Sequence, residues 1–301
     1  MDSTTLQTFL TVAQLGSFTD AAEKLYLSQS AVSKRIAALE SELNSRLLDR
    51  IGKQVLLTEA GKVLAAHART LLMEIEDTRR EILNLSAEVS GRLSVGTSHH
   101  VGLHRLPKVL ENYTSHYPQV ELDLQFMNSE QICDAIKHGE LELGIITLPL
   151  QAMEHLASHP VWDDRLEFVI SRRHPLMEKP QIRHLTNGAI QCRLKDLANY
   201  PAIPPTRGTF TRAIVDKLFS HHELTLTTRM ETNYLETIKM LVSVGLGWSV
   251  LPQTMLDNDV SVLQIPNVHV SRQLGAVWHS SRTLSNAANK MLMELEQNRD
   301  A

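Results

Sequence analysis

The stretch GSFTDAAEKLYLSQSAVSKRIAALESEL, residues 16–43, decides the fold of the first part of the chain. Gly16 ends a preceding segment of helical periodicity, and Ser17 or Thr19 can cap a short second helix. After a tight turn, Ser28 is a suitable N-cap for a third helix that continues to the end of the stretch. Two short helices joined by a tight turn are typical of a helix-turn-helix.

The third predicted helix has an apolar face and a polar face, and its first turns are polar. An α-helix fits the major groove of DNA, where its first turns present side chains to base edges. Gln29 can offer an amide fork to adenine, and Lys34 or Arg35 can reach guanine or phosphate. Short hydroxyl side chains on the same surface can contact phosphate or bases, namely Ser28, Ser30 and Ser33.

A small hairpin is predicted after this helix. Arg46, Arg50 and Lys53 flank the apolar run 55–57, which is typical of a wing that lies beside the groove. Helix geometry alone leaves an alternative open, in which the polar face of the third helix is only the solvated surface of a small helical domain.

A long helical pattern runs from Thr58, itself a plausible N-cap, to about Glu88. Its seam positions alternate steps of four and three, as in a heptad repeat, and they predict a partner helix. These positions are Leu64, Ala68, Leu71, Ile75, Thr78, Ile82, Leu85 and Val89. The alternative is a long helix that lies against its own domain.

Beyond a hinge at residues 89–91, strands alternate with helices. Alternating apolar residues predict strands over 93–97, 120–126 and 224–230, and helical stretches are expected near 103–116, 129–138, 208–222, 233–244 and 285–297. This pattern predicts an α/β domain with a largely parallel sheet. Two runs of such units indicate two lobes, with a ligand crevice at the carboxyl ends of the strands.

A candidate ligand site follows the first of these strands. Thr97, Ser98, His99 and His100 come directly after residues 93–96 and just before a predicted helix. Hydroxyl groups and free backbone amides at a helix N-terminus favour an anion. We therefore expect a small anionic effector at this position.

Composition sets broad limits on the class of protein. No apolar run approaches the ~20 residues that span a bilayer, and the N-terminus lacks the basic start of a secretory signal, so we expect a cytoplasmic protein without membrane contact. A net charge of −4 argues against a wholesale nucleic-acid coat protein but does not exclude local DNA binding. Cys133 and Cys192 are too few for a disulfide framework.

No catalytic or metal-binding motif emerges from the chain, and no cofactor is expected. The Gly245-Leu246-Gly247 turn lacks the third glycine of a dinucleotide fingerprint. His155 and His159 have helical spacing but no glutamate between them that could act as a base. A buried structural thiol is the simplest interpretation of Cys133, and a redox switch that joins it to Cys192 is the alternative.

Residues 9–61 resemble the N-terminal domain of LysR-type transcriptional regulators. The matching positions are Phe9, Ala13, Gly16, Ser17, Phe18, Ala21, Ala22, Leu25, Ser28, Gln29, Ser30, Ala31, Val32, Ser33, Ile36, Leu39, Glu40, Leu43, Leu47, Arg50, Leu57, Thr58, Glu59, Ala60 and Gly61. The rest of the chain is similar in outline, including Gly245-Leu246-Gly247 followed by Leu251-Pro252. The resemblance implies an all-α, winged N-terminal domain, a linker helix and a two-lobed α/β effector domain like type 2 periplasmic binding proteins.

The resemblance also implies roles for particular residues. Gln29, Ser30, Ser33, Lys34 and Arg35 become the recognition residues, with Arg50 and Lys53 as wing or backbone contacts, although many relatives have proline at the position of Ser30. Effector contacts are implied for Thr147, Thr206, Arg207, Asn233 and Tyr234.

Domain limits and assembly follow from the same resemblance. We expect DNA binding by residues 1–57, a dimerisation linker over 58–90 and an effector domain over 91–301. Lobe I would comprise about 91–160 and 266–301, and lobe II about 161–265. The implied partners are double-stranded promoter DNA, a small-molecule effector, further copies of the chain in a homotetramer built from dimers, and RNA polymerase.

Two other classes of protein compete with this interpretation. A solute-binding module would use its N-terminal domain only for assembly and would show no sequence-dependent affinity for DNA. An enzyme would need a nucleophile–base pair or a metal cluster, and the sequence presents neither. The dense helix-turn-helix match favours the regulator.

Overall fold

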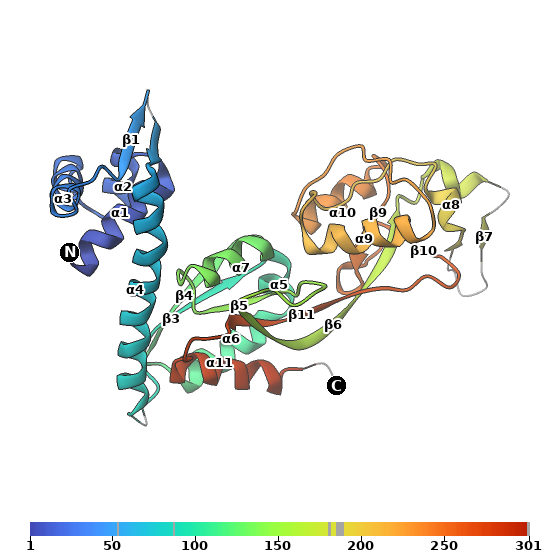
Figure 1. Cartoon of the computed structure of the whole chain (residues 1–301). Coiled ribbons are helices and arrows are strands. Elements are labelled where there is room, and N and C mark those ends of the chain that lie inside the picture. Colours follow the sequence, from blue (N-terminus) through green and yellow to red (C-terminus); the bar gives the residue numbers. More distant parts are fainter. Residues whose placement is uncertain (53, 87, 180–181, 185–189, 300–301) are drawn as a thin grey trace. The chain divides into compact units, whose positions relative to one another are not determined.

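The computed structural model describes residues 1–52, 54–86, 88–179, 182–184 and 190–299. The chain forms two compact units, Met1–Ser86 and Ala87–Ala301, and each is described by itself (Figure 1). The first unit contains α1 (Ser3–Leu15), α2 (Phe18–Lys24), α3 (Gln29–Glu42), β1 (Leu48–Ile51), β2 (Gln54–Leu57) and α4 (Glu59–Asn84).

Hydroxyl side chains begin three of the helices in the first unit, as the sequence predicts. Ser17 accepts a hydrogen bond from the backbone N–H of Asp20 at the start of α2. Ser28 accepts from Ala31 at 3.2 Å, and Thr58 caps α4 in the same way. Each cap satisfies a backbone donor that the helix leaves free, so these predicted N-caps are confirmed.

The core of the first unit joins the helices to the β1–β2 hairpin. Phe9, Val12, Val32 and Ile36 pack with Val55 of β2, among other residues, in one buried cluster. The backbone N–H of Val55 donates to the carbonyl of Gly16 at 2.9 Å, which fixes the hairpin against the end of α1. The predicted wing is therefore confirmed as a two-stranded hairpin.

Gly61 allows α4 to pass close to the hairpin. A Cβ atom at this position would lie 2.0 Å from the carbonyl oxygen of Leu47, which no ordinary packing tolerates. This close approach explains why position 61, one of the positions on which the family resemblance rests, is a glycine.

The long helix α4 changes character along its length. Near its start, Ala65 and Ala68 are buried against the first unit, whereas Leu71 and Ile75 on the same seam are exposed. Ile82 is 64% exposed and Leu85, which caps the helix C-terminus, is 87% exposed. The helix ends at Asn84, earlier than the expected Glu88. The first turns of the helix therefore pack on their own domain, as the alternative interpretation expects, and its later turns carry exposed apolar residues. The pairing of this seam with a second helix stays a prediction.

The second unit is built on a mixed sheet. It contains β3 (Gly91–Thr97), α5 (His99–His104), α6 (Leu106–His116), β4 (Val120–Phe126), α7 (Ser129–Lys137), β5 (Leu143–Thr147), β6 (Leu156–Ile170), η1 (Pro175–Glu178), β7 (Arg183–His184), β8 (Ile190–Gln191), α8 (Leu194–Leu197), α9 (Phe210–His221), α10 (Leu235–Ser243), β9 (Ser249–Pro252), η2 (Gln253–Met255), β10 (Ser261–Gln264), β11 (Val270–His279) and α11 (Asn286–Gln297). The strand order is β4-β3-β5-β11-β6-β10-β8-β7, and β9 also pairs with β6.

The expectation of a largely parallel sheet was wrong. The strands β3, β4 and β5 are parallel to one another, but β11 is antiparallel to both β5 and β6. The strand β6 carries the chain out of the first lobe, and β11 carries it back, so the two strands run in opposite directions. They are therefore not parts of repeated βαβ units.

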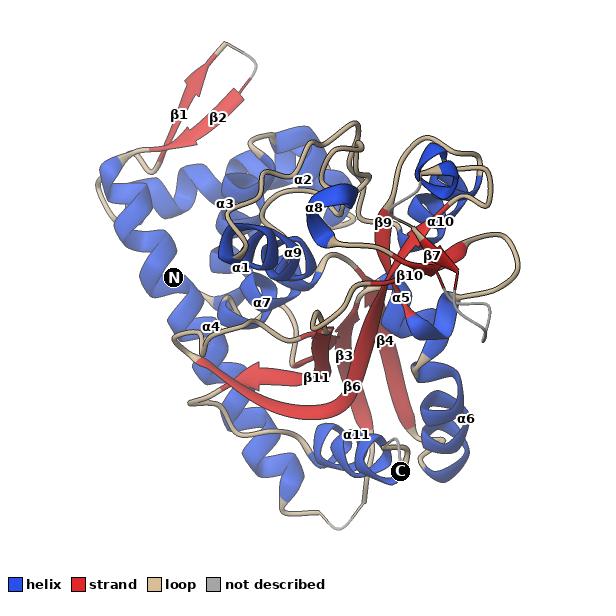
Figure 2. Cartoon of the chain, turned by 90° about the vertical axis from the view of Figure 1, so that its right-hand side faces the viewer, coloured by secondary structure: helices blue, strands red, loops and turns tan. Residues whose placement is uncertain are grey.

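These two long strands connect two lobes (Figure 2). Trp162 and Leu274 belong to a core with β3, α6 and α11, whereas Leu166 and Val270 belong to a separate core with α8 and α9. The change of core therefore falls inside β6 and inside β11. Gly275 marks a register shift between them, where a Cβ would lie 2.2 Å from the carbonyl oxygen of His159.

Two local expectations also need correction. The helix expected over 103–116 is divided into α5 and α6, because Pro107 begins a new helix within its first two positions. The strand expected over 224–230 does not form, and within this stretch Thr228 makes an isolated β-bridge with Ala202. Within the described residues, no helix is both long enough and apolar enough to cross a membrane.

Candidate nucleic-acid interface and ligand pocket

The first turns of α3 present a short polar surface. Gln29 and Ser30 are exposed, Lys34 is exposed and Ser33 is half-buried, while Val32 on the opposite face is fully buried. This division leaves an amide, hydroxyls and a cation on one side of a helix whose other side is fixed in the core. Such a helix can enter the major groove without rearrangement of its own domain.

Three of the predicted contact residues already have hydrogen-bond partners inside the unit. Ser28 caps α3, and its hydroxyl also lies 3.0 Å from that of Ser30. Arg35 is half-buried and donates from Nη1 to the hydroxyl of Thr8 at 3.3 Å. Arg35 is therefore held against α1, whereas Gln29 and Lys34 are exposed.

The hairpin and the turn before α3 add further groups. The Arg50 guanidinium lies over the ring of Phe18, 4.5 Å from its centroid, and the side chain remains exposed. Lys53, also predicted as a contact, lies outside the described residues. Tyr26 is 97% exposed in the left-handed turn between α2 and α3.

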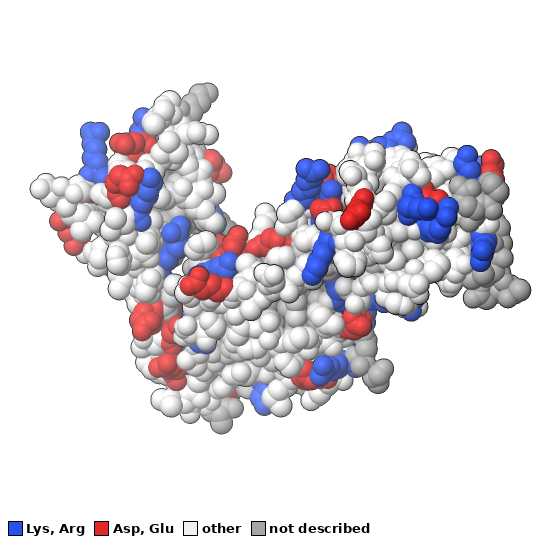
Figure 3. Space-filling model, turned by 45° about the vertical axis from the view of Figure 1, so that its right-hand side comes forward, with Lys and Arg blue, Asp and Glu red and all other residues white. Residues whose placement is uncertain are grey.

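Charged side chains of both signs are spread over the face of the molecule that Figure 3 shows. Figure 3 shows basic and acidic side chains interspersed over the visible face, without one continuous basic field. A net charge of −4 agrees with this distribution. DNA binding must therefore depend on the few cations of the first unit and on the fit of α3.

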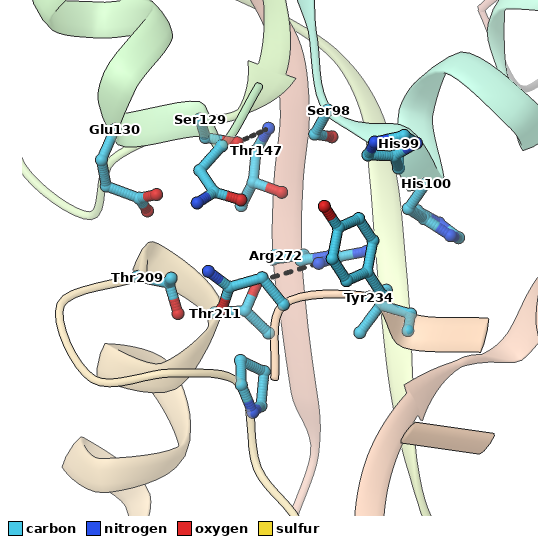
Figure 4. A pocket seen from close by; sticks show the side chains of 14 residues that line it. Ser98, His99, His100, Ser129, Glu130, Thr147, Thr209, Thr211, Tyr234 and Arg272 are labelled. Atoms are coloured by element: carbon cyan, nitrogen blue, oxygen red, sulfur yellow. Dashed lines mark hydrogen bonds between the residues drawn. The ribbon is translucent and has the colours of Figure 1, made fainter. Parts of the chain in front are cut away.

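The second unit contains a polar pocket of about 60 Å³ between its lobes (Figure 4). Six of the predicted effector residues line it, namely Ser98, His99, His100, Thr147, Asn233 and Tyr234. Eight further residues complete the lining, namely Asn128, Ser129, Glu130, Pro205, Thr209, Thr211, Leu235 and Arg272.

Arg272 is the charged group at the bottom of this pocket. It is 5% exposed, and its Nε donates to Oδ2 of Asp164 at 2.8 Å while Nη1 donates to the hydroxyl of Thr211 at 2.8 Å. Its Nη2 is buried and makes no hydrogen bond. Burial lowers the pKa of Arg272, and the neighbouring Asp164 opposes that shift, so the guanidinium remains a buried cation.

Charged groups of both signs surround this cation. Asp164 is the cross-strand neighbour of Arg272 and also accepts from Nη2 of Arg105 at 3.4 Å. Glu130 also lines the pocket, and its carboxylate accepts the backbone N–H of Phe210 at 2.5 Å. Among these groups, Nη2 of Arg272 is a buried donor without a hydrogen-bond acceptor.

His100 adds no charge to this cluster. Burial, reinforced by the nearby charge of Arg272, lowers the pKa of His100 to about 2. The imidazole is therefore neutral at physiological pH, although it lies 3.8 Å from Asp164. His99 is in a different environment, since its ring lies between those of Phe126 and Tyr234, with centroids 5.3 Å and 5.1 Å away.

Three predicted effector residues do not line the pocket. Thr97 is fully buried, and its hydroxyl donates to the carbonyl of Ile145 at 2.8 Å, so it joins β3 to β5. The backbone N–H of Thr206 donates to the side chain of Asn233, which orients that pocket residue. Arg207 is exposed and lies outside the pocket lining.

Sequence reasoning missed Arg272 even though a signal was present. In β11 buried and exposed residues alternate, and Arg272 takes an inward position between Val270 and Leu274. A charged residue at an inward position of an alternating strand needs a buried partner or a ligand. Asp164 has the same signature in β6, between Trp162 and Leu166. Thr211 and Ser129 carried no comparable signal.

Both cysteines are buried thiols that do not line this pocket. Burial raises the pKa of Cys133 to about 12 and that of Cys192 to about 12. The two side chains also belong to different core clusters. Reactive cysteines are thiolates in partly exposed, electropositive sites, so this environment favours the structural interpretation of both over the redox switch.

The chain matches two family models. "Bacterial regulatory helix-turn-helix protein, lysR family" matches residues 3–62, and "LysR substrate binding domain" matches residues 86–299. The chain therefore belongs to the LysR family of bacterial transcriptional regulators. Its first unit carries the DNA-binding helix-turn-helix, and its second unit is the effector-binding domain of that family.

Individual relatives agree in sequence and in fold. The uncharacterized HTH-type transcriptional regulator YeiE of Escherichia coli K12 is 32% identical over 292 residues, which are 95% of this chain and 94% of the relative. Full-length OxyR of Pseudomonas aeruginosa has a TM-score of 0.68 at 24% identity, with 98% of each chain covered. CbnR complexed with its target DNA has a TM-score of 0.64 at 19% identity, with 99% of this chain and 100% of that chain covered. The predicted fold class is confirmed.

Proposed function

We propose that the regulator is switched by a small anion that binds at Arg272 between the two lobes. The observation that carries this proposal is the buried Nη2 of Arg272, which has no hydrogen-bond partner. A buried guanidinium donor left unpaired costs about 1–3 kcal/mol or more, and an acceptor oxygen from a ligand would recover that loss. This argument is stronger than the helix dipole, because α5 has only six residues.

The pocket also limits the size of the ligand. A single water needs ~10–15 Å³ of accessible space, so a pocket of about 60 Å³ holds only a few non-hydrogen atoms. An inorganic oxyanion or a short carboxylate fits this space, and a large aromatic acid does not without opening of the lobes. Ser98 and Thr147 offer hydroxyl donors around it.

The same pocket suggests how binding is transmitted. Ser98 and Thr147 follow strands of the first lobe, whereas Thr209 and Tyr234 precede helices of the second. A ligand that contacts residues of both lobes stabilises the arrangement in which the lobes are closed around it. The strands β6 and β11, which connect the lobes, absorb the change in the angle between them. We propose that this closure changes the arrangement of subunits and so the spacing of the recognition helices on DNA.

The remaining assignments complete the proposal. Residues 1–57 bind the operator, residues 58–90 form the dimerisation linker and residues 91–301 sense the effector. The DNA contacts are those predicted from the sequence. Two dimers form a homotetramer that acts in the cytoplasm on promoter DNA and contacts RNA polymerase. Its role is regulatory and not enzymatic.

Calorimetry with a panel of small anions tests the pocket, with the corresponding neutral amides as matched ligands. Arg272→Lys keeps a cation beside Asp164 but removes the guanidinium fork, and it should weaken anion binding at least tenfold. Ser98→Ala and Thr147→Ala should keep operator binding but lose the effect of the anion on the DNA footprint. Thr206→Ala is the control, because this residue is outside the pocket lining. Equal anion affinity in Arg272→Lys and Thr206→Ala would refute the site.

A further inference from the structure

Three potential metal ligands from two helices converge beside the effector pocket. His100 and His104 lie one turn apart on α5, and Glu236 lies in the first turn of α10. One ligand atom from each lies within 4.8 Å of the other two. Within the described parts of the chain, no other group of three histidine, cysteine or carboxylate side chains meets this criterion. No metal-binding motif is present in the sequence, in which His104 and Glu236 are 132 residues apart.

The ring of His100 supplies an independent indication of a ligand. It is 5% exposed, and neither of its ring nitrogens makes a hydrogen bond. Buried imidazoles normally have a partner at one nitrogen or both. Asp164 lies 3.8 Å from Nε2, too far for a hydrogen bond, so both ring nitrogens are left without a partner.

Some charged side chains near His100, His104 and Glu236 oppose the approach of a metal cation, and others favour it. Arg105 and Arg272 oppose the approach of a cation, but both hydrogen-bond to the carboxylate of Asp164, which offsets one of their charges. Glu236 supplies a second carboxylate, and its Oε1 lies 3.2 Å from Nε2 of His104. A divalent ion between these two groups would replace a contact that already brings their ligand atoms together.

We propose that His100, His104 and Glu236 bind a divalent transition-metal ion, with Zn²⁺ the ion that best suits the set. Two imidazoles and one carboxylate are ligands of known zinc sites that keep a fourth position open for water. His104 and Glu236 border a separate surface pocket of about 570 Å³, so the fourth position faces solvent. The ligand set is therefore accessible from one side and fixed by a buried ring on the other.

The ion would join the two lobes. Val101 of α5 belongs to the core of the first lobe, whereas Leu235 and Ile238 of α10 belong to a core of the second. His100 and Leu235 also line the effector pocket. A bound ion would thus hold α5 and α10 together next to that pocket. This inference does not depend on the identity of the anion.

Direct metal titration tests the proposal. The full-length protein is freed of metal by chelation and gel filtration, and Zn²⁺ is then added in competition with a chromophoric chelator. The wild type should bind one tight equivalent per chain. His104→Gln and Glu236→Gln, both at exposed positions, should weaken that equivalent by at least about tenfold. The matched control is His159→Gln, because His159 pairs with Glu296 outside the cluster, and this variant should keep the wild-type affinity.

Two further readouts distinguish a metal site from an ion pair. Co²⁺ in place of Zn²⁺ should give visible absorption in the wild type and in His159→Gln, but not in Glu236→Gln. Zn²⁺ should raise the Tm of the same two proteins only. A wild type that binds no tight equivalent would overturn the proposal. Equal Zn²⁺ affinity in the wild type, His104→Gln and Glu236→Gln would overturn it as well.

Discussion

Single side chains on α3 divide the tasks of positioning and recognition. Gln29 is exposed at the first position of the helix, while Arg35 is held by Thr8 and Ser28 is engaged in the cap. An amide can form two hydrogen bonds with adenine in the major groove, whereas a lysine contributes mainly charge. The effect of a substitution should therefore depend on whether its target is a base or a phosphate.

We predict that Gln29→Ala lowers operator affinity by about 1–3 kcal/mol, chiefly at one base position. Lys34→Ala should lower affinity on all sequences to a similar degree and reduce the log–log salt slope by about 0.9. Fluorescence titrations against the operator, single-base variants and random DNA measure both effects. Equal losses on operator and random DNA for Gln29→Ala would remove its role in recognition.

His174 makes the stability of the second unit depend on pH. Its ring is buried, and Nδ1 accepts the backbone N–H of Leu176 at 3.2 Å, so that nitrogen must be unprotonated. Burial lowers the pKa of His174 in the folded state. The unfolded chain, with a histidine pKa of about 6.5, therefore takes up a proton before the folded chain does. The contribution of neutral His174 to the free energy of unfolding is fully present above pH ~6.5. It is lost as the pH falls below that value, by at most ~1.4 kcal/mol per pH unit.

The variant His174→Asn tests this dependence, because its amide oxygen can accept the same backbone N–H without titrating. We expect a shallower loss of stability between pH 7.5 and 5.5 than in the wild type. The measurement is the unfolding midpoint by tryptophan fluorescence, since Trp162, Trp248 and Trp278 all lie in the second unit. Parallel pH profiles of the two proteins would exclude His174 as the cause.

At the scale of a secondary-structure element, helix α4 carries a seam of apolar positions along its length. Its seam was predicted from spacing alone, and the structure shows that the later seam positions Leu71, Ile75 and Ile82 are uncovered within the chain. Exposed apolar residues in a row on a helix favour a second helix of the same kind. The pairing of two α4 helices would place two recognition helices about one DNA turn, roughly 34 Å, apart.

We predict that Leu71→Asp with Ile75→Asp dissociates the oligomer, because pairing would bury two carboxylates without partners. Sedimentation should show a smaller species, and operator binding should fall steeply. Val63→Asp with Leu83→Asp is the matched control, since both residues are exposed and lie off the seam. An unchanged mass for the first variant, or equal dissociation of both, would show that the seam does not pair.

At the scale of the whole molecule, local signals were predicted better than long-range ones. The caps at Ser17, Ser28 and Thr58 and the hairpin follow from neighbouring residues, and the sequence contained them. The mixed sheet did not follow, because the direction of β11 is set by pairing with strands more than a hundred residues away. Arg272 and Asp164 lie opposite each other because of the same pairing, so the sequence did not predict this buried ion pair at the pocket.

The order of the domains could be predicted because the periodicity of the apolar residues changes from one part of the sequence to the next. Short helical patterns, a heptad seam and alternating strands follow one another, and each corresponds to a distinct part of the structure. The positions of Thr206 and Arg207 outside the pocket lining show the limit of transferring residue roles by resemblance. A matched motif places a loop near a site but does not fix which of its side chains point inward.

Selection of genomic fragments by the full-length protein tests the central claim most directly. Fragments of the source genome would be bound in the presence of excess random DNA and then footprinted. We predict that a small set of fragments is retained, each with protected half-sites about one DNA turn apart, and that Gln29→Ala lowers their enrichment. Retention of all fragments in proportion to their length, with no defined footprint, would contradict sequence-specific regulation by this protein.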